Sequence, residues 1–367
     1  MSHTPQNPQN HQSHQSRKKL SDLTREDCEF VLDGRAEALA PLKNETIVIT
    51  GGSGFMGAWV AETIACLNDR YAFGVKAVFI SRKAKAFQAK YPHLGERKDF
   101  EYVSTDVRNL VELPRETGWL IHAAGNPDSR FHSSNPVETM TSIADGTATV
   151  LREASRCSGF KKALNLSSAL IYGVQPFDVE AVAETYKGAP LCGSVFSSYA
   201  EAKRYAETLC AAVRSQSRIP IVTARPFAFL GPYQSIETPW AINNFIKDAF
   251  NGGPINVKGD GQTVRSYLYG ADCAYWLLKI LVNGTEGSAY NVGSARAITL
   301  ENLAGLVSRQ FGSRPLVKLR TLTEAVHRSR MVPDVTAATQ SLGLTETITL
   351  EKAIERTTLW NQLIWQK

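Results

Sequence analysis

Residues 46–57 read TIVITGGSGFMG, and this stretch decides the fold. A short apolar run that ends in glycines is typical of a strand buried in a parallel sheet. The glycines that follow are spaced GxxGxxG. In this variant of the dinucleotide pattern the first glycine permits a tight turn, the second lets the backbone approach a pyrophosphate, and the third lets a helix pack closely on the strand. The amino end of that helix would face the anion. We therefore predict a dinucleotide-binding turn formed by Gly51, Ser53, Gly54, Phe55, Met56 and Gly57.

The rest of the chain continues this alternation. Further strands are predicted at 75–81, 100–104, 119–123, 162–167 and 220–224, with helices at about 56–68, 137–158 and 199–216. Strands that alternate with helices predict an α/β fold with a Rossmann-type doubly wound parallel sheet. Beyond about residue 230 the pattern loosens into short helices, turns and strands. We expect an NAD(P)-binding domain at 45–230 and, at 231–367, mainly a smaller C-terminal substrate-binding lobe, interleaved with that domain.

The amino-terminal segment differs in character. Residues 1–20 are rich in Gln, Asn, His, Pro and Ser, and we expect a disordered tail because they have little apolar surface to bury. Residues 21–44 are expected to form a helical extension outside the core domain. Its helix is predicted from Thr24 to about Leu39, because Thr24 and Asp27 resemble a capping box.

Composition narrows the class of protein. A net charge of +6 over 367 residues is mild, and no Lys/Arg run with interleaved aromatics accompanies it, so no nucleic-acid partner is expected. No apolar stretch is long enough for a membrane helix, and no secretory signal is recognised at the start. The six cysteines form no CxxC pair, so neither a metal site nor a disulfide frame is expected. A cytoplasmic protein without membrane contact fits best.

The end of the second predicted strand bears on the choice of dinucleotide. An NAD site usually has Asp or Glu there, bonded to the ribose 2′-hydroxyl. This chain has Ser81 and Arg82, a hydroxyl that can donate a hydrogen bond and a guanidinium that can pair with a 2′-phosphate. NADP is therefore favoured. NAD stays open as the alternative, with Arg82 stacked on the adenine or facing solvent.

At this point the chain resembles the extended short-chain dehydrogenase/reductase family, the NAD(P)-dependent nucleotide-sugar epimerases and dehydratases. The resemblance covers roughly residues 45–320 and rests on the order and spacing of several motifs. After the glycine turn these are Asp106-Val107, His122-Ala123-Ala124, Ser167–Gly173 (SSALIYG), Tyr199–Lys203 (YxxxK), Arg225-Pro226-Phe227 with Gly231-Pro232, Arg265–Tyr267 with Asp272, and Tyr290–Gly293. The resemblance implies that Asp106 and Val107 lie at the adenine and that Ala123 and Ala124 line the cofactor.

The same resemblance implies a catalytic group of Ser168, Tyr199 and Lys203. Tyr199 and Lys203 are four residues apart on a predicted helix and so share one face. An ammonium and a nicotinamide cation favour the phenolate, which can then take a proton from a sugar hydroxyl as hydride leaves the carbon. Ser168 would bond the same oxygen, and Lys203 would also hold the nicotinamide ribose. Arg265 is expected to pair with the substrate diphosphate; a structural salt bridge is its alternative role.

Some positions depart from the family pattern. The family's 4,6-dehydratases have an Asp-Glu pair after the catalytic Ser or Thr, and its decarboxylases usually keep a Glu there, whereas this chain has Ala169 and Leu170. Neither can move a proton, which argues against dehydratase and decarboxylase chemistry by the usual route. Ala228 and Ile143 also stand where the family usually has Asn.

We therefore expect an NAD(P)-dependent nucleotide-sugar epimerase of the C4 type, which oxidises a sugar carbinol transiently. The alternatives are an NADPH-dependent keto-sugar reductase, dehydratase or decarboxylase chemistry by other residues, an enzyme of other carbonyl compounds, and a non-catalytic NAD(P)-binding protein. The resemblance further implies a nucleotide-diphosphate sugar as partner, a homodimer built on the helices at 137–158 and 199–216, and a role in polysaccharide biosynthesis.

Overall fold

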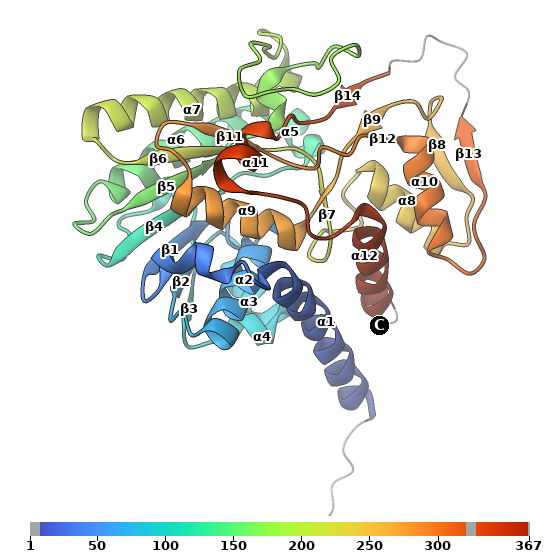
Figure 1. Cartoon of the computed structure of the whole chain (residues 1–367), viewed down its shortest axis with the longest axis horizontal. Coiled ribbons are helices and arrows are strands. Elements are labelled where there is room, and N and C mark those ends of the chain that lie inside the picture. The colour runs from blue at the N-terminus through green and yellow to red at the C-terminus, as the bar shows by residue number, and fades with distance from the viewer. Residues whose placement is uncertain (1–7, 321–327, 366–367) are drawn as a thin grey trace, which may run out of the picture.

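The centre of the molecule is one parallel sheet of seven strands, seen in a computed structural model that describes residues 8–320 and 328–365 (Figure 1). The strands lie in the order β11-β6-β5-β4-β1-β2-β3, and every neighbouring pair is parallel. Their bounds are β1 Thr46–Thr50, β2 Lys76–Ile80, β3 Phe100–Val103, β4 Thr117–His122, β5 Lys162–Leu166, β6 Ile221–Pro226 and β11 Ala289–Val292. The predicted doubly wound fold is confirmed.

The strand order reverses beside β1, and this reversal positions the site. The chain runs from β1 outward through β2 to β3, then returns to place β4 on the other side of β1. The carboxyl ends of β1 and β4 therefore diverge into loops on opposite sides, which opens a crevice at the edge of the sheet. Thr50 and His122, the last residues of these strands, are partners in the register.

Helices cover both faces of the sheet. Side chains of β1 alternate between two apolar cores, Ile47 and Ile49 in one and Val48 in the other, as expected for a strand buried on both faces. On the first face lie α2 (Phe55–Tyr71), α9 (Gly270–Asn283) and the 3₁₀ helix η1 (Ala36–Leu42), and on the second α6 (Pro136–Ala154) and α7 (Ser198–Ser217). The shorter segments near the sheet are α3 Ala84–Lys90, α4 Pro92–Gly95, α5 Ser129–Ser134, η2 Val107–Asn109, η3 Ala169–Tyr172 and η4 Val195–Ser197.

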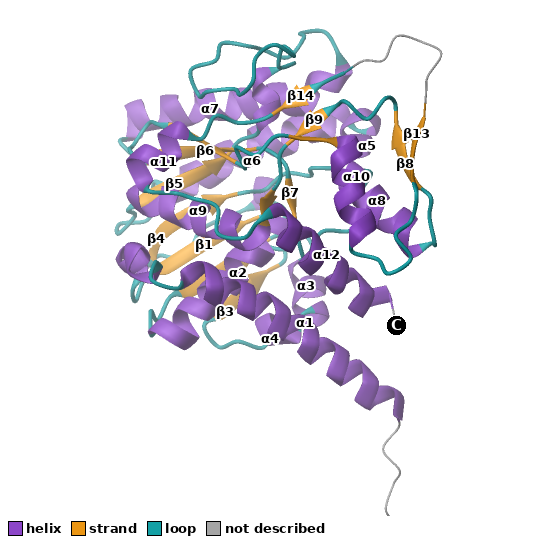
Figure 2. Cartoon of the chain, turned by 45° about the vertical axis from the view of Figure 1, so that its right-hand side comes forward, coloured by secondary structure: helices purple, strands orange, loops and turns teal. Residues whose placement is uncertain are grey.

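A second, smaller lobe lies beside the carboxyl ends of the strands (Figure 2). Its described residues form three small sheets, β10-β7, β12-β9-β14 and β13-β8. The chain leaves the large sheet after β6 and returns for α9 and β11, so the two parts are interleaved. The elements of this lobe are β7 Phe229–Leu230, α8 Ala241–Phe250, β8 Ile255–Lys258, β9 Val264–Arg265, β10 Leu268–Tyr269, β12 Ile298–Thr299, α10 Leu300–Arg309, β13 Val317–Arg320, β14 Arg330–Met331 and α12 Leu350–Trp365. Between β14 and α12, α11 (Thr336–Leu342) packs against β11 and α9 of the larger lobe.

The amino-terminal extension differs from the prediction. Helix α1 spans Pro8–Leu32, so the segment expected to be disordered, residues 1–20, is helical from Pro8 onward. Residues 1–7 lie outside the described part of the chain. The predicted helix at 24–39 was wrong in both bounds, because α1 ends at Leu32 and the 3₁₀ helix η1 follows it.

The supposed capping residues of that helix instead make tertiary contacts. The Thr24 hydroxyl donates to Glu62 Oε1 of α2 at 2.6 Å. Asp27 Oδ2 accepts a hydrogen bond from the Tyr269 hydroxyl at 2.6 Å, and the Asp27 carboxylate also pairs with Arg356 of α12. Thus α1 packs across α2, α9 and α12 and joins the two lobes (Figure 1). In the part of the chain that the structure describes, no helix has the length and apolar character needed to cross a bilayer.

Candidate active site

The glycine turn connects β1 to α2 as predicted, and its geometry fits a pyrophosphate. Gly51 has φ of +72°, and a Cβ there would lie 2.5 Å from the carbonyl oxygen of Ala123. A Cβ on Gly57 would lie 2.5 Å from the backbone of Gly52. Helix α2 begins after Gly54, which gives it no side-chain cap. The N–H groups of its first turn therefore remain free of side-chain acceptors, which suits a bound anion.

The side chains after β2 stand next to this turn. Ser81 Oγ donates to Ser53 Oγ at 2.8 Å, so the two hydroxyls tie the end of β2 to the turn. Arg82 is exposed over 57% of its side chain, and its one ion pair among the described residues is a long contact of 3.8 Å with Glu138. A guanidinium held this loosely is available to a phosphate at the adenosine end of a dinucleotide.

Asp106 does not stand alone where the adenine is expected. Both of its carboxylate oxygens accept hydrogen bonds from the Arg108 guanidinium, at 2.9 Å each. That hydrogen bonding lowers the pKa of Asp106 below its usual value. Arg108 also pairs with Glu138 of α6 at 2.8 Å, and Val107 is buried in the second core. The two arginines and two carboxylates form a charged rim near the end of β2.

A buried hydrogen-bond chain holds the ends of β1 and β4 together. Thr147 donates to the carbonyl of Ile143 at 2.6 Å, so it accepts from His122 Nε2 at 3.1 Å. His122 Nδ1 is then an acceptor, and the Thr50 hydroxyl donates a hydrogen bond to it at 2.8 Å. Burial lowers the pKa of His122 to about 3, which keeps the imidazole neutral. The Thr50 hydroxyl in turn accepts from the Ala124 N–H, which positions the loop that begins with Ala123 and Ala124.

The three predicted catalytic residues come together at the start of α7. The Ser168 hydroxyl, which follows β5, lies close enough to the Tyr199 phenol to lower its pKa. Lys203 is 3% exposed and lies one turn further along α7, with Nζ 5.9 Å from the centre of the Tyr199 ring. Its Nζ donates to the carbonyl of Leu166 at 2.6 Å. The i,i+4 spacing therefore places both groups on the face of α7 that looks into the fold.

The ionisation of this group follows from its burial. Burial raises the pKa of Tyr199 to about 12, and the hydrogen bond with Ser168 lowers it in part. Burial lowers the pKa of Lys203 to about 8. At neutral pH the cofactor-free site thus holds a phenol and an ammonium. A further positive charge beside the phenol would favour the phenolate that proton abstraction needs.

The catalytic group and the glycine turn are joined by one short loop. A Cβ on Gly125 would lie 3.6 Å from Lys203 Nζ, and Gly51 lies against Ala123 two residues earlier. Nicotinamide dinucleotide would therefore be held by the turn at its phosphates and by Lys203 and Tyr199 at its reactive end.

The hydrogen bonds of Arg265 within the described residues do not involve Ser168, Tyr199 or Lys203. The guanidinium donates to the carbonyls of Val264 and Ser329 and to the Ser329 hydroxyl, at 2.8 to 3.2 Å. Burial lowers its pKa. Within residues 8–320 and 328–365 it has no carboxylate partner, so its charge is uncompensated there.

Comparison with known proteins decides the family. Residues 47–293 match the model of the NAD dependent epimerase/dehydratase family. The chain belongs to this family and is an enzyme of it. Among curated relatives, UDP-glucuronic acid decarboxylase 4 of Arabidopsis thaliana is 28% identical over 308 residues, which are 84% of this chain and 66% of that protein. UDP-glucuronic acid decarboxylase 1 of Xenopus tropicalis is 27% identical over 320 residues, 87% of this chain and 72% of the relative.

Solved structures show the same fold at lower identity. UDP-N-acetylglucosamine 4-epimerase from Methanobrevibacter ruminantium M1, in complex with UDP-N-acetylmuramic acid, superposes with a TM-score of 0.76 at 19% identity, over 89% of this chain and all of that one. UDP-glucuronic acid 4-epimerase from Bacillus cereus, in complex with NAD, gives 0.75 at 21% identity, over 88% and 97%.

In this member of the epimerase/dehydratase family the two positions directly after Ser168 carry no proton-transfer group. Ala169 is buried, and Leu170 is 40% exposed. The Leu170 N–H donates to Ser168 Oγ at 3.1 Å, so the 3₁₀ turn η3 orients the Ser168 hydroxyl. Ala228, at the second position where the family usually has Asn, accepts a hydrogen bond from the Leu268 N–H at its carbonyl and packs its methyl group against the first core.

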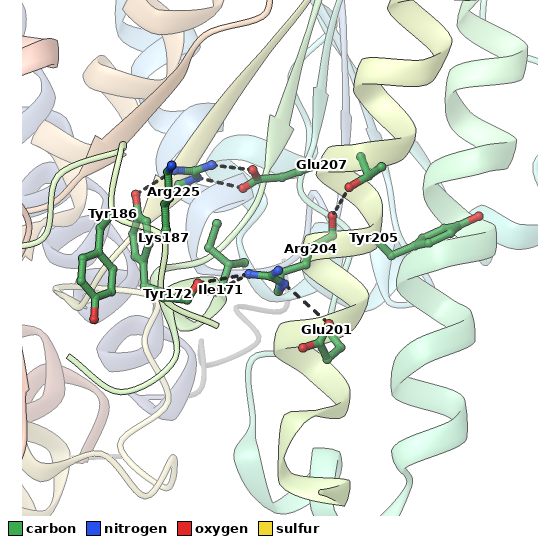
Figure 3. A pocket seen from close by; sticks show the side chains of 11 residues that line it. Ile171, Tyr172, Tyr186, Lys187, Glu201, Arg204, Tyr205, Glu207 and Arg225 are labelled. Atoms are coloured by element: carbon green, nitrogen blue, oxygen red, sulfur yellow. Dashed lines mark hydrogen bonds and ion pairs between the residues drawn. The ribbon is translucent and has the colours of Figure 1, made fainter. Parts of the chain in front are cut away.

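A pocket of about 590 Å³ lies along α7, but none of the catalytic side chains lines it (Figure 3). Its base is a bidentate ion pair between Arg225 and Glu207, with donor–acceptor distances of 3.0 and 2.7 Å, and the Tyr172 hydroxyl accepts from the same guanidinium. Arg204 spans its side to the carbonyls of Ile171 and Gly188. Arg225 therefore has a structural role next to η3, and this pocket is separate from the group formed by Ser168, Tyr199 and Lys203.

Sequence reasoning missed three residues of this region, His132, Arg108 and Glu138. The ring of His132 stacks on Tyr199, and the other two complete the charged rim. Only the predicted topology could have indicated these residues, because the loops that follow parallel strands β3, β4 and β5 must meet at the carboxyl edge of the sheet. That rule predicts proximity and leaves the particular contacts open.

Proposed function

We propose that this enzyme epimerises the sugar of a nucleotide-diphosphate sugar at a carbinol carbon, of the C4 type. The observation that carries the proposal is the pairing of an assembled group of Ser168, Tyr199 and Lys203 with an alanine and a leucine at the next two positions. Oxidation and reduction of a carbinol need only the first group. Loss of water or of a carboxyl group by the family's usual route needs a carboxylate that this chain lacks.

Each residue of the group has its own role in the proposed reaction. Bound NAD(P) would supply the acceptor and donor of hydride at the sugar carbon. Tyr199 takes the hydroxyl proton and later returns it. Ser168 donates to the same sugar oxygen and stabilises its developing charge, and the Lys203 ammonium stabilises the phenolate. Epimerisation further requires that the oxidised sugar turn its other face before hydride returns.

Reduction of a keto-sugar with NADPH is the second candidate, and Arg82 favours it. Its exposed, loosely paired guanidinium suits a 2′-phosphate, and a cofactor that leaves after each turnover suits reduction. Arg265, uncompensated within the described residues, is proposed to bind the substrate diphosphate in either case. Decarboxylation of UDP-glucuronic acid is the activity in the names of the curated relatives, and the leucine at 170 argues against it here.

Two measurements separate these activities. The purified protein is denatured and the released nucleotide is identified. Near-stoichiometric NAD(H) or NADP(H) supports an epimerase, because the cofactor must stay bound between half-reactions. The native enzyme is then incubated with UDP-glucuronic acid, UDP-glucose and UDP-N-acetylglucosamine, and products are followed by ¹H NMR. A C4 epimer supports the proposal. A pentose product with release of CO₂, or turnover only of a keto-sugar with consumption of NADPH, would overturn it.

We also propose a homodimer in which α6 and α7 of each subunit form a four-helix bundle. Met140 and Tyr205, on α6 and α7, are 43% and 53% exposed. Sedimentation equilibrium tests the proposal. A monomer at micromolar concentration would contradict it, and Tyr205→Glu should weaken the dimer.

A further inference from the structure

The ring of His132 lies flat against the phenol of Tyr199. The ring centroids are 4.3 Å apart and the planes differ by 11°. His132 belongs to α5, which follows β4, whereas Tyr199 belongs to α7, which follows β5. The imidazole is 7% exposed, so its contact with the phenol is part of the packed interior. No step of the proposed mechanism uses this histidine.

One nitrogen of this histidine is anchored to the loop that lines the cofactor site. His132 Nε2 lies 2.6 Å from the carbonyl oxygen of Asn126. A carbonyl can only accept, so Nε2 carries the proton. Burial lowers the pKa of His132, although the hydrogen bond to Asn126 raises it in part, and the ring is neutral at neutral pH. The anchoring carbonyl is two residues beyond Ala124, on the loop that also passes Lys203 at Gly125.

We propose that His132 is a positioning residue for Tyr199. Its neutral ring restricts the rotation of the Tyr199 side chain by packing against one face of the phenol. The hydrogen bond to Asn126 fixes the position of the imidazole relative to the loop that lines the cofactor site. The proposal rests on the proposed function, in which the Tyr199 oxygen must reach one sugar hydroxyl. A reacting group that is misplaced by about 1 Å can lose roughly 100-fold in rate. Stacked aromatic pairs gain interaction energy beyond that of burying their surface, so the two rings have a preferred relative position.

The kinetic test separates the ring from the hydrogen bond. His132→Ala removes both and should lower kcat by about tenfold or more, with KM for the nucleotide sugar changed less than about threefold. His132→Phe keeps a flat ring but loses the hydrogen bond to Asn126, so it should lose clearly less of kcat than His132→Ala does. Ser133→Ala, at an exposed position on the same helix where the hydroxyl has the Ser129 carbonyl as its one partner among the described residues, should behave as wild type. Wild-type kcat in His132→Ala, or equal losses in the alanine and phenylalanine variants, would overturn the proposal.

Tyr199→Phe is assayed alongside, so that the two proposals fail separately. If Tyr199→Phe turns over normally, the proposed function fails. If Tyr199→Phe is inactive and His132→Ala is normal, only the positioning role fails.

A spectroscopic measurement needs no activity and covers the case in which His132→Ala does not fold. The cofactor-free protein is labelled with ¹³C at histidine Cε1, and the signal of His132 among the seven histidines is assigned with His132→Phe. Stacking on a phenol shields the Hε1 proton on the labelled carbon of His132. Its resonance should therefore lie upfield and should move downfield in Tyr199→Leu. A resonance that stays in place in Tyr199→Leu would refute the stacked arrangement.

Discussion

Replacing Lys203 with methionine should change how the stability of the cofactor-free enzyme depends on pH. Lys203 is 3% exposed, and its ammonium has one hydrogen bond among the described residues, to the Leu166 carbonyl. Burial lowers its pKa from 10.5 to about 8. Holding the charged form inside the fold therefore costs on the order of 3 kcal/mol relative to the unfolded chain.

The sign of the effect follows from proton binding. Between pH 8 and 10.5 the unfolded chain keeps the Lys203 proton and the folded chain loses it, so the free energy of unfolding rises with pH across this window. Below pH 8 both states are protonated and the full cost applies. Wild type should therefore gain about 2 to 3 kcal/mol over Lys203→Met between pH 7 and pH 10.

Urea denaturation of both proteins at pH 7, 8, 9 and 10 measures this difference. Lys258→Met, at an exposed position of β8, serves as the control for loss of a surface lysine and sets the baseline. A difference between wild type and Lys203→Met that is constant from pH 7 to 10 would refute the assignment of a lowered Lys203 pKa. In that case the ammonium would lie in better-solvated surroundings than the structure shows.

Three further predictions concern the site. Tyr199→Phe should lower turnover at least about 100-fold, the low end for general acid–base catalysis, whereas Tyr71→Phe at the exposed end of α2 should not; steady-state kinetics decides, and normal turnover in Tyr199→Phe refutes its role. Gly57→Ala should weaken dinucleotide binding and lower Tm, because its Cβ would lie 2.5 Å from the preceding turn, whereas Gly305→Ala in α10, with no atom nearer than 3.7 Å, should leave both unchanged or raise Tm slightly; calorimetry checks both. Arg82→Ala should raise the Kd for NADP about tenfold while changing that for NAD little, because a charged hydrogen bond is lost only with the 2′-phosphate; equal effects on both dinucleotides would count against NADP preference.

Much of the large sheet could be predicted because each parallel strand is a local apolar run buried on both faces. β1 begins and ends at the predicted residues, β5 ends one residue early, and β6 begins one residue later and ends two residues later than predicted. β11 was recognised as a motif and missed as a strand. It is four residues long, and its place at the edge beside β6 depends on the chain's return through α9.

The extension α1 shows the opposite case. Thr24 and Asp27 look like helix-capping residues because their spacing is that of a cap, yet both lie inside a helix and bond to α2 and β10. A polar side chain that has a partner in the folded protein carries the same sequence signal as one that caps a helix. Distinguishing them requires knowing what packs alongside.

The sequence by itself determined the dinucleotide turn and the pairing of Tyr199 with Lys203, since glycine spacing and the helical repeat are short-range geometry. The tertiary structure alone decided what surrounds them. Stacking of His132 on the phenol, the Arg108–Glu138 pair at the rim and the low pKa of Lys203 all arise where loops from different strands meet. Such contacts depend on burial and on groups tens of residues apart, and no local spacing records them.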